Sequence, residues 1–141
     1  MCFPISGKKC ACGKEGRRIE ETSSDVKKAI ICFQYTERIK SELIIAANLL
    51  EEMGELKNDE LVGAEKLMLS FLRALQGEIR IAYSVLQMQN FKEAGDKVAE
   101  IAENVSSHEY QEATKRISEA ISRITTGGQQ ATQLLKEKGL L

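Results

Sequence analysis

Apolar residues recur at steps of three and four along most of this chain, which is the spacing of one face of an α-helix. The pattern begins after residue 22 and continues to the last turn of the sequence. Residues 1–22 show no helical period and contain several glycines among charged residues. The pattern predicts an all-α fold: an antiparallel helical bundle of about four helices over residues 23–141, preceded by an irregular, cysteine-bearing tail over residues 1–22.

The first predicted helix begins near Ser23 or Ser24, because either side chain can cap a helix and Asp25 complements its dipole. It ends at Gly54 and the polar run of residues 57–59. Its inward positions, spaced by threes and fours, are Ile31, Tyr35, Ile39, Leu43, Ala46, Leu50 and Met53. This spacing predicts one apolar face along the whole helix.

The second predicted helix runs from Asp59 to about Met88, and Gly77 in its middle predicts close packing or a kink. Its inward positions are Leu61, Ala64, Met68, Phe71, Leu75, Ile79, Ala82 and Leu86. Further apolar residues widen this stripe well past one face: Val62, Leu67, Leu69, Leu72, Ile81 and Val85. A helix that is apolar over most of its girth lies centrally or meets a partner chain, so we expect part of it to contact a second subunit in a homodimer.

Two more helices follow. Asn90 is the expected cap of the third, whose inward residues are Phe91, Ala94, Val98, Ile101 and Val105. The segment 106–109 has the form of a capping box for the fourth helix, with Ser106 as its N-cap and Glu109 three residues later. The inward residues of the fourth helix are Tyr110, Ala113, Ile117, Ala120 or Ile121, Ile124, Ala131, Leu134 and Leu135. A kink or short break is expected at Gly127-Gly128, and Gly139 supplies the C-terminal stop.

The composition supports this picture. A chain of 141 residues fits one domain, and it can bury a core without disulfides or metals. The one proline, Pro4, leaves the rest of the chain open to long helices. Aromatic residues make up 5% and tryptophan is absent, so the core must be aliphatic.

The charge is small overall but uneven along the chain. The net charge of −1 argues against nucleic acid as a partner of the whole molecule. Residues 1–18 are the exception, because they hold five basic residues against Glu15 alone: Lys8, Lys9, Lys14, Arg17 and Arg18. Such a tail can touch phosphate, a membrane surface or the acidic body of the protein, or it can remain solvated.

Two observations bear on location. No apolar run approaches the roughly 20 residues that a membrane-spanning helix requires, and the N-terminus lacks the apolar stretch of a signal peptide. We therefore expect an intracellular, cytoplasmic protein. In that compartment cysteines are reduced, bound to metal or redox-active rather than part of a disulfide framework.

All four cysteines lie in the first 32 residues, and Cys10-Ala11-Cys12-Gly13 is the most unusual local sequence of the chain. Zinc takes four thiolate or imidazole ligands, so Cys10 and Cys12 can supply two corners of a tetrahedral site. Cys2 can supply the third ligand, and Cys32 or the single histidine, His108, the fourth. Zinc is the cofactor that this pattern suggests.

Other interpretations of the cysteines stay open. Cations around Cys10 and Cys12 should lower their thiol pKa values, which favours redox chemistry. Cys2 beside a basic stretch is also typical of a palmitoylated, polybasic anchor. The tail can equally be exposed and chemically idle, and Cys32 can be a small core residue.

A cluster of carboxylates provides a resemblance. The segment Glu51-Glu52-Met53-Gly54-Glu55, together with Glu93-Ala94-Gly95-Asp96, resembles the metal-binding motif of the all-α, MazG-type nucleoside triphosphate pyrophosphatases. The resemblance implies that Glu51, Glu52, Glu55, Glu93 and Asp96 hold magnesium for a triphosphate. Carboxylates on facing helices of a bundle are ligands that magnesium accepts. The alternative is a solvated acidic face.

Three functions therefore follow from the sequence. The first is a non-catalytic helical interaction or assembly module, oligomeric, with the tail as an accessory contact. The second is a zinc-binding or thiol-redox regulator, and the third is the magnesium-dependent pyrophosphatase. The sequence contains no nucleophile elbow, phosphate-cradling glycine loop or helical Glu-x-x-His pair, and His108 is expected to be exposed rather than catalytic. The first function is preferred, because the chain offers much amphipathic helix and little site chemistry.

Overall fold

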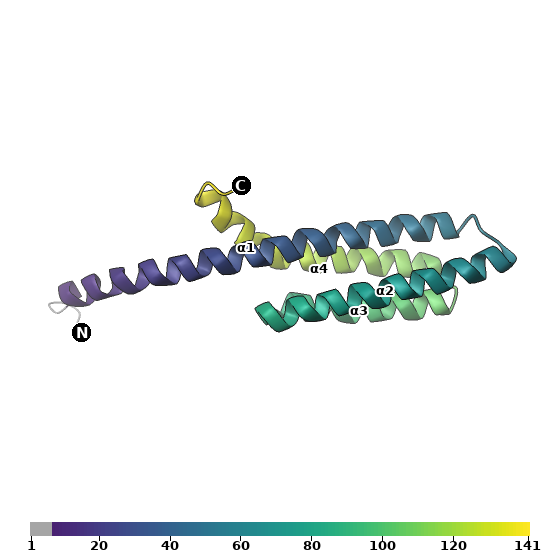
Figure 1. Ribbon diagram of the computed structural model, residues 1–141, viewed down its shortest axis with the longest axis horizontal. Helices are drawn as coiled ribbons and strands as arrows, with labels where there is room; N and C mark the ends of the chain where they lie inside the picture. The colour runs from purple at the N-terminus through teal and green to yellow at the C-terminus, as the bar shows by residue number, and fades with distance from the viewer. Residues whose placement is uncertain (1–6) are drawn as a thin grey trace.

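The computed structural model describes the backbone of residues 7–141 and the side chains of residues 23–141. Over this range the chain forms four helices and no strand (Figure 1). The helices are α1 (Gly7–Met53), α2 (Asn58–Leu86), α3 (Gln89–Ser106) and α4 (Tyr110–Glu137). The all-α bundle predicted from the sequence is confirmed.

The four helices form an up-and-down bundle. Helix α1 packs against α2 and α4, and α3 packs against the same two helices, so α1 and α3 lie on one diagonal and α2 and α4 on the other. Short connections at residues 54–57, 87–88 and 107–109 reverse the chain, which makes successive helices antiparallel. Helices that follow one another in the sequence are thus neighbours around the bundle.

The core follows a seven-residue repeat. The buried positions of α1 alternate in steps of three and four: Ala29, Cys32, Thr36, Ile39, Leu43, Ala46, Leu50 and Met53. The same alternation holds for Met68, Leu72, Leu75, Ile79, Ala82 and Leu86 of α2. The predicted inward residues of α3, from Phe91 to Val105, are all buried. This heptad spacing is the pattern of side chains that interlock between nearly parallel helix axes.

Two predicted core positions of α1 are wrong. Ile31 is exposed and Tyr35 half-buried, while Cys32 and Thr36 take their places. The predicted stripe reached Leu43 by three successive steps of four residues. Each such step moves a side chain about 40° past a whole turn, so three of them displace the stripe about 120° around the helix. In α2 the same kind of error made Phe71 inward, whereas it is half-buried and its neighbour Leu72 is in the core.

Helix α4 departs from the heptad near its C-terminus. Its buried positions are Ala113, Ile117, Ala120, Ile124, Gly128, Ala131 and Leu135, with two successive steps of four ending at Gly128. Such an insertion shifts the phase of a bundle helix. The helix is continuous through Gly127 and Gly128, so there is no break, and Figure 1 shows its last turns, in yellow, bending out of line beside α1.

The N-terminus of α1 differs from the prediction. The helix begins at Gly7, so residues 7–22 are helical rather than irregular, and Ser23 and Ser24 lie inside the helix instead of capping it. No proline follows Pro4, and the lysines, arginines and glutamates of this segment are good helix formers that offset its glycines. Both figures show this part of α1 extending beyond the ends of the other helices.

The predicted caps of α3 and α4 are also wrong. Met88 precedes α3 in extended conformation, and Asn90 lies inside the helix, where its side chain packs against Gly127 of α4. Ser106 is the last residue of α3, and Glu109 is the N-cap of α4 without a side-chain cap bond. Backbone turns with positive φ, such as His108 at 61°, set these ends in place of capping side chains.

Candidate interaction surface

The outer seam between α1 and α2 is fixed in register by an ion pair. Arg38 Nε lies 2.6 Å from Glu78 Oε1. One heptad nearer the connecting loop, Ile45 of α1 is therefore level with Phe71 of α2. Leu49 and Leu67, one turn further, line the same hollow. We call this surface the α1–α2 seam; it comprises Ile31, Tyr35, Arg38, Glu42, Ile45, Leu49, Leu67, Phe71, Ala74, Glu78, Ile81 and Val85.

Exposed aliphatic side chains gather on this seam. Six of the eleven exposed large hydrophobic residues lie on this seam: Ile31, Ile45, Leu49, Leu67, Ile81 and Val85. Leu67 is 76% exposed, the largest fraction among them. Within the bounds of α3 and α4, by contrast, no described large hydrophobic side chain is exposed to this degree. Apolar surface is therefore concentrated on one side of the bundle.

The loop end of the seam is hollowed. Leu49, Met53 and Leu56 of the first helix and its loop surround a pocket of about 200 Å³. Leu67 and Met68 close it from α2. An apolar hollow at the end of an apolar stripe can receive a protruding aliphatic or aromatic side chain of a partner.

The centre of the seam is charged. Arg38 Nε contacts Glu42 at 3.4 Å as well as Glu78 at 2.6 Å, so two carboxylates share one guanidinium. Burial raises the pKa of the Glu42 carboxyl, and the neighbouring Glu78 charge raises it further, against the lowering effect of Arg38. The contacts of Arg38 with both carboxylates are made at Nε.

The opposite seam, between α3 and α4, is of another kind. Ion pairs bridge the two helices along its length: Lys97 with Glu119 at 3.4 Å, Arg123 with Glu93 at 3.6 Å and Arg116 with Glu100 at 4.0 Å. The Arg116 guanidinium lowers the pKa of the Glu119 carboxyl. This seam carries paired charges rather than aliphatic side chains.

The described cysteine is a core residue. Cys32 is buried in α1, and its Sγ lies 3.7 Å from Met88 Sδ. Burial raises the pKa of its thiol, which keeps it protonated and unreactive. The interpretation of Cys32 as a small core residue is therefore confirmed.

Cys32 is too distant to share a metal ion with Cys10 and Cys12. All three lie on the continuous helix α1, and Cys10 precedes Cys32 by 22 residues, or about 33 Å at 1.5 Å per residue. His108 lies in the α3–α4 connection, at the opposite end of the molecule from the start of α1 (Figure 1). The side chains of Cys10 and Cys12, and all of Cys2, lie outside the described residues.

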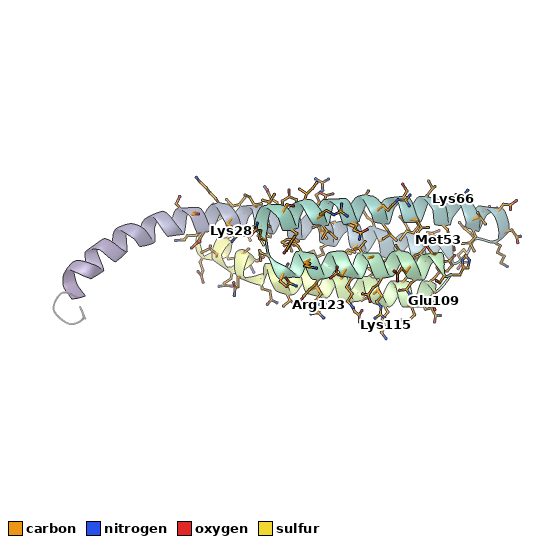
Figure 2. The ribbon with its side chains drawn as sticks, turned by 90° about the horizontal axis from the view of Figure 1, so that it is seen from below. Lys28, Met53, Lys66, Glu109, Lys115 and Arg123 are labelled. Carbon is orange, nitrogen blue, oxygen red and sulfur yellow. The ribbon has the colours of Figure 1, made fainter. Side chains whose placement is uncertain are left out.

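The five candidate magnesium ligands are not brought together. Glu51 and Glu52 lie at the end of α1 beside Met53, which Figure 2 places at the same end of the bundle as Glu109, and Glu55 follows in the loop. Helix α3 begins at the other end and lies diagonally from α1. There Glu93 pairs with Arg123 at 3.6 Å, and Asp96 lies 3.9 Å from Lys92. Among the side chains of residues 23–141, no group of three or more His, Cys, Asp or Glu is placed to hold a metal ion.

A polar cluster that the sequence did not reveal joins α2 to the α3–α4 connection. His108 Nδ1 lies 2.6 Å from Glu65 Oε2, and the Tyr110 hydroxyl donates a hydrogen bond to the same oxygen. Burial, followed by the hydrogen bond to Glu65, raises the pKa of Tyr110 to about 12. Glu65 stands three residues before buried Met68, at the heptad position that Leu72, Ile79 and Leu86 occupy further along α2, and this is the one sequence signal of the cluster. His108 is exposed, as predicted.

A hollow of about 750 Å³ lies between α1 and the bent end of α4. Its charged groups include Glu37 and Lys40, which pair with each other at 2.7 Å. The rest of its wall is mainly threonine and glutamine side chains. This hollow gathers no cluster of acid, base and nucleophile, so its geometry supports no particular reaction.

Among the described residues, no helix has the length and apolar character needed to cross a membrane. Comparison of the chain with models of known protein families, with curated proteins and with solved structures finds no match to any of them. A function for this chain is therefore inferred from the side chains of the α1–α2 seam.

Proposed function

We propose that this protein is a non-catalytic helical interaction module that holds a protein partner on its α1–α2 seam. The observation that carries the proposal is the segregation of exposed aliphatic side chains, such as Leu67, Ile81 and Val85, onto this seam while the α3–α4 seam is bridged by ion pairs. Exposed apolar side chains gathered on one face of a protein are typical of interaction sites.

The shape of the seam supports a helical partner. Two antiparallel helices present ridges of side chains at steps of three and four, and a third helix packs into the grooves between them. Arg38, Glu42 and Glu78 at the centre would set the register of that partner, because buried charges must meet opposite charges. The partner we propose has an apolar helical face interrupted by a charged group.

The extension of α1 offers an accessory contact. Residues 7–22 continue the helix beyond the bundle, and this segment contains the basic residues of the N-terminus (Figure 1). An acidic region of the same partner is the surface that such a segment would attract.

A photo-crosslinking side chain placed at Leu67 or Ile81 of the full chain tests the proposal in the native cell. We expect covalent protein adducts from both positions. Lys115 is the control position, because Figure 2 shows it pointing away from the bundle on α4. If Leu67 and Ile81 form adducts no more often than Lys115, the α1–α2 seam is not an interaction surface.

A further inference from the structure

We infer that the occupant of the α1–α2 seam is a second copy of this chain, packed face to face about a twofold axis that crosses the helices at the level of Arg38 and Glu42. The inference rests on the proposed function, since it names the partner of the same seam. It is carried by the order of side chains along the seam and by the charges at its centre.

The order of apolar and charged side chains along α1, and of the outer apolar pairs along α2, is the same in both directions. Along α1 the exposed or half-exposed positions run Ile31, Tyr35, Arg38, Glu42, Ile45 and Leu49, which is two apolar residues, two charged residues and two apolar residues. Along α2 the facing positions are Val85, Ile81, Glu78, Ala74, Phe71 and Leu67, again with apolar pairs at both ends. A pattern that survives reversal is self-complementary, which a twofold interface between identical subunits requires.

A half turn about this axis stacks each helix on its own copy in the opposite direction. Ile31 then meets the partner's Leu49, and Tyr35 meets the partner's Ile45. Arg38 meets the partner's Glu42, and this contact occurs twice, once on each side of the axis. Along α2, Val85 meets the partner's Leu67. The outer apolar pairs of both helices therefore pack on apolar pairs, and Ala74 meets the partner's Glu78 near the axis.

The central charges favour this arrangement over an uncharged partner. Within one chain, Glu42 and Glu78 share the single guanidinium of Arg38. The Arg38 side chain is 66% exposed and makes both of its ion pairs through Nε. Because the guanidinium is exposed, it can also reach a carboxylate on the partner, and its fork suits such a shared contact.

The size of the seam sets the expected strength. From Ile31 to Leu49 the seam is about 27 Å long at 1.5 Å per residue, and two helices with their side chains are about 20 Å wide. The flat footprint is thus roughly 540 Å² on each copy, near the lower limit for a specific dimer. We expect a reversible dimer with a dissociation constant on the order of micromolar.

Sedimentation equilibrium of the full chain across that concentration range tests the inference with a matched pair of variants. Val85 and Val62 are both on α2, with exposures of 54% and 55%, but Val62 lies off the seam. We expect Val85→Lys to weaken the dimer at least tenfold and Val62→Lys to leave it unchanged. Thermal unfolding followed by circular dichroism confirms that both variants fold. Equal weakening by the two variants would overturn the inference.

Charge reversal tests the orientation. In the antiparallel arrangement Arg38→Glu places two acidic residues together, and Glu42→Arg places two basic residues together, so each variant alone should be monomeric. Mixed in equal amounts, the two should form a heterodimer, because both central contacts then join opposite charges. Self-association of Glu42→Arg, or failure of the mixture to associate, contradicts the arrangement.

The two proposals fail separately. The purified wild-type chain could sediment as a monomer while adducts from Leu67 have a mass other than twice that of the chain. In that case the inference of a homodimer is wrong and the proposal of an interaction module stands. If the chain is a monomer and no adducts form at Leu67 or Ile81, both proposals are wrong.

Discussion

The two outer seams of this bundle differ although the cores beneath them follow one rule. Helices α1, α2 and α3 repeat every seven residues, and α4 does so up to its shift at Gly128. Above that shared core, the α3–α4 seam is bridged by three ion pairs between its helices, whereas the α1–α2 seam has one, flanked by aliphatic side chains. Folding alone therefore does not dictate the chemistry of an outer seam.

The difference shows where each seam contributes free energy. Exposed ion pairs add about 0–1 kcal/mol each to folding, but they hold water and discourage other chains from packing. The aliphatic side chains of the α1–α2 seam are exposed in the single chain, so they contribute little to its folding. Their burial would add about 25 cal/mol for each Å² removed from water, and only association can provide it. The α1–α2 seam is thus suited to binding and the α3–α4 seam to solvent.

The largest effect on stability is expected at the contact between α4 and α1, which joins the α1–α2 half of the bundle to the α3–α4 half. Gly128 is buried, and a Cβ atom there would lie 2.9 Å from both Cγ2 and Oγ1 of Thr36. Gly128→Ala should lower the free energy of unfolding by about 1–3 kcal/mol, because the added methyl overpacks a filled core. Urea unfolding measures this change.

A double variant provides the control. Thr36→Ala removes both atoms that the new methyl would meet, so Gly128→Ala should cost less in that background than in the wild type. If Gly128→Ala is as stable as the wild type, the bent end of α4 does not pack tightly on α1, and the two halves are joined less closely than the structure indicates.

A smaller effect of opposite sign is expected on α2. Nothing lies within 4 Å of a Cβ added to Gly77, and the helix is regular there, so the predicted close packing is wrong. Gly77→Ala should raise the free energy of unfolding by about 0.5–1 kcal/mol, through the helix propensity of alanine alone. Gly63→Ala, also in open space on α2, is the matched control. Loss of stability at Gly77 but not at Gly63 would indicate that another chain covers α2 there.

The sequence predicted the inward residues well where the steps between apolar residues alternated strictly between three and four. All five inward residues of α3 are buried, because their steps already follow the heptad. Ile31 and Tyr35 were misplaced because steps of four drift around a helix. The start of α1 was missed because glycines in residues 7–22 were taken as breaks, although no proline prevents the helix there.

The seam could be predicted only in part. The excess of apolar residues on the second helix indicated a partner surface, and Leu67 and Ile81 are indeed exposed. Leu72 of the same set is in the core instead. The apolar residues of α2 alone could not show this, because the placement of α1 beside α2 decides which positions face inward and which face outward. The link of Glu65 to Tyr110 was not foreseen, since it joins segments that are distant in the sequence and depends on how α4 begins.

The smallest effect on stability at neutral pH concerns this link, which fastens the loop end of α2 to the start of α4. The pKa of Tyr110 is raised to about 12, above its ordinary value of 10.0, so the neutral phenol is favoured in the folded chain. Its contribution to folding is complete below pH 10 and is lost as the pH rises through 12. Ultraviolet absorbance should show one late-titrating tyrosine that disappears in Tyr110→Phe.

Glu65→Gln identifies the cause of that shift. Removal of the carboxylate charge should move the late titration toward the ordinary value, while burial keeps part of the shift. The same substitution should leave dimerisation unchanged, because Glu65 faces His108 and Tyr110 rather than the α1–α2 seam. If Tyr110 titrates like a free tyrosine in the wild type, the loop end of α2 is held by apolar contacts alone. In that case no hydrogen bond from Tyr110 anchors the α2 wall of the hollow at Leu49 and Leu67, and this hollow should open more readily than the rest of the seam.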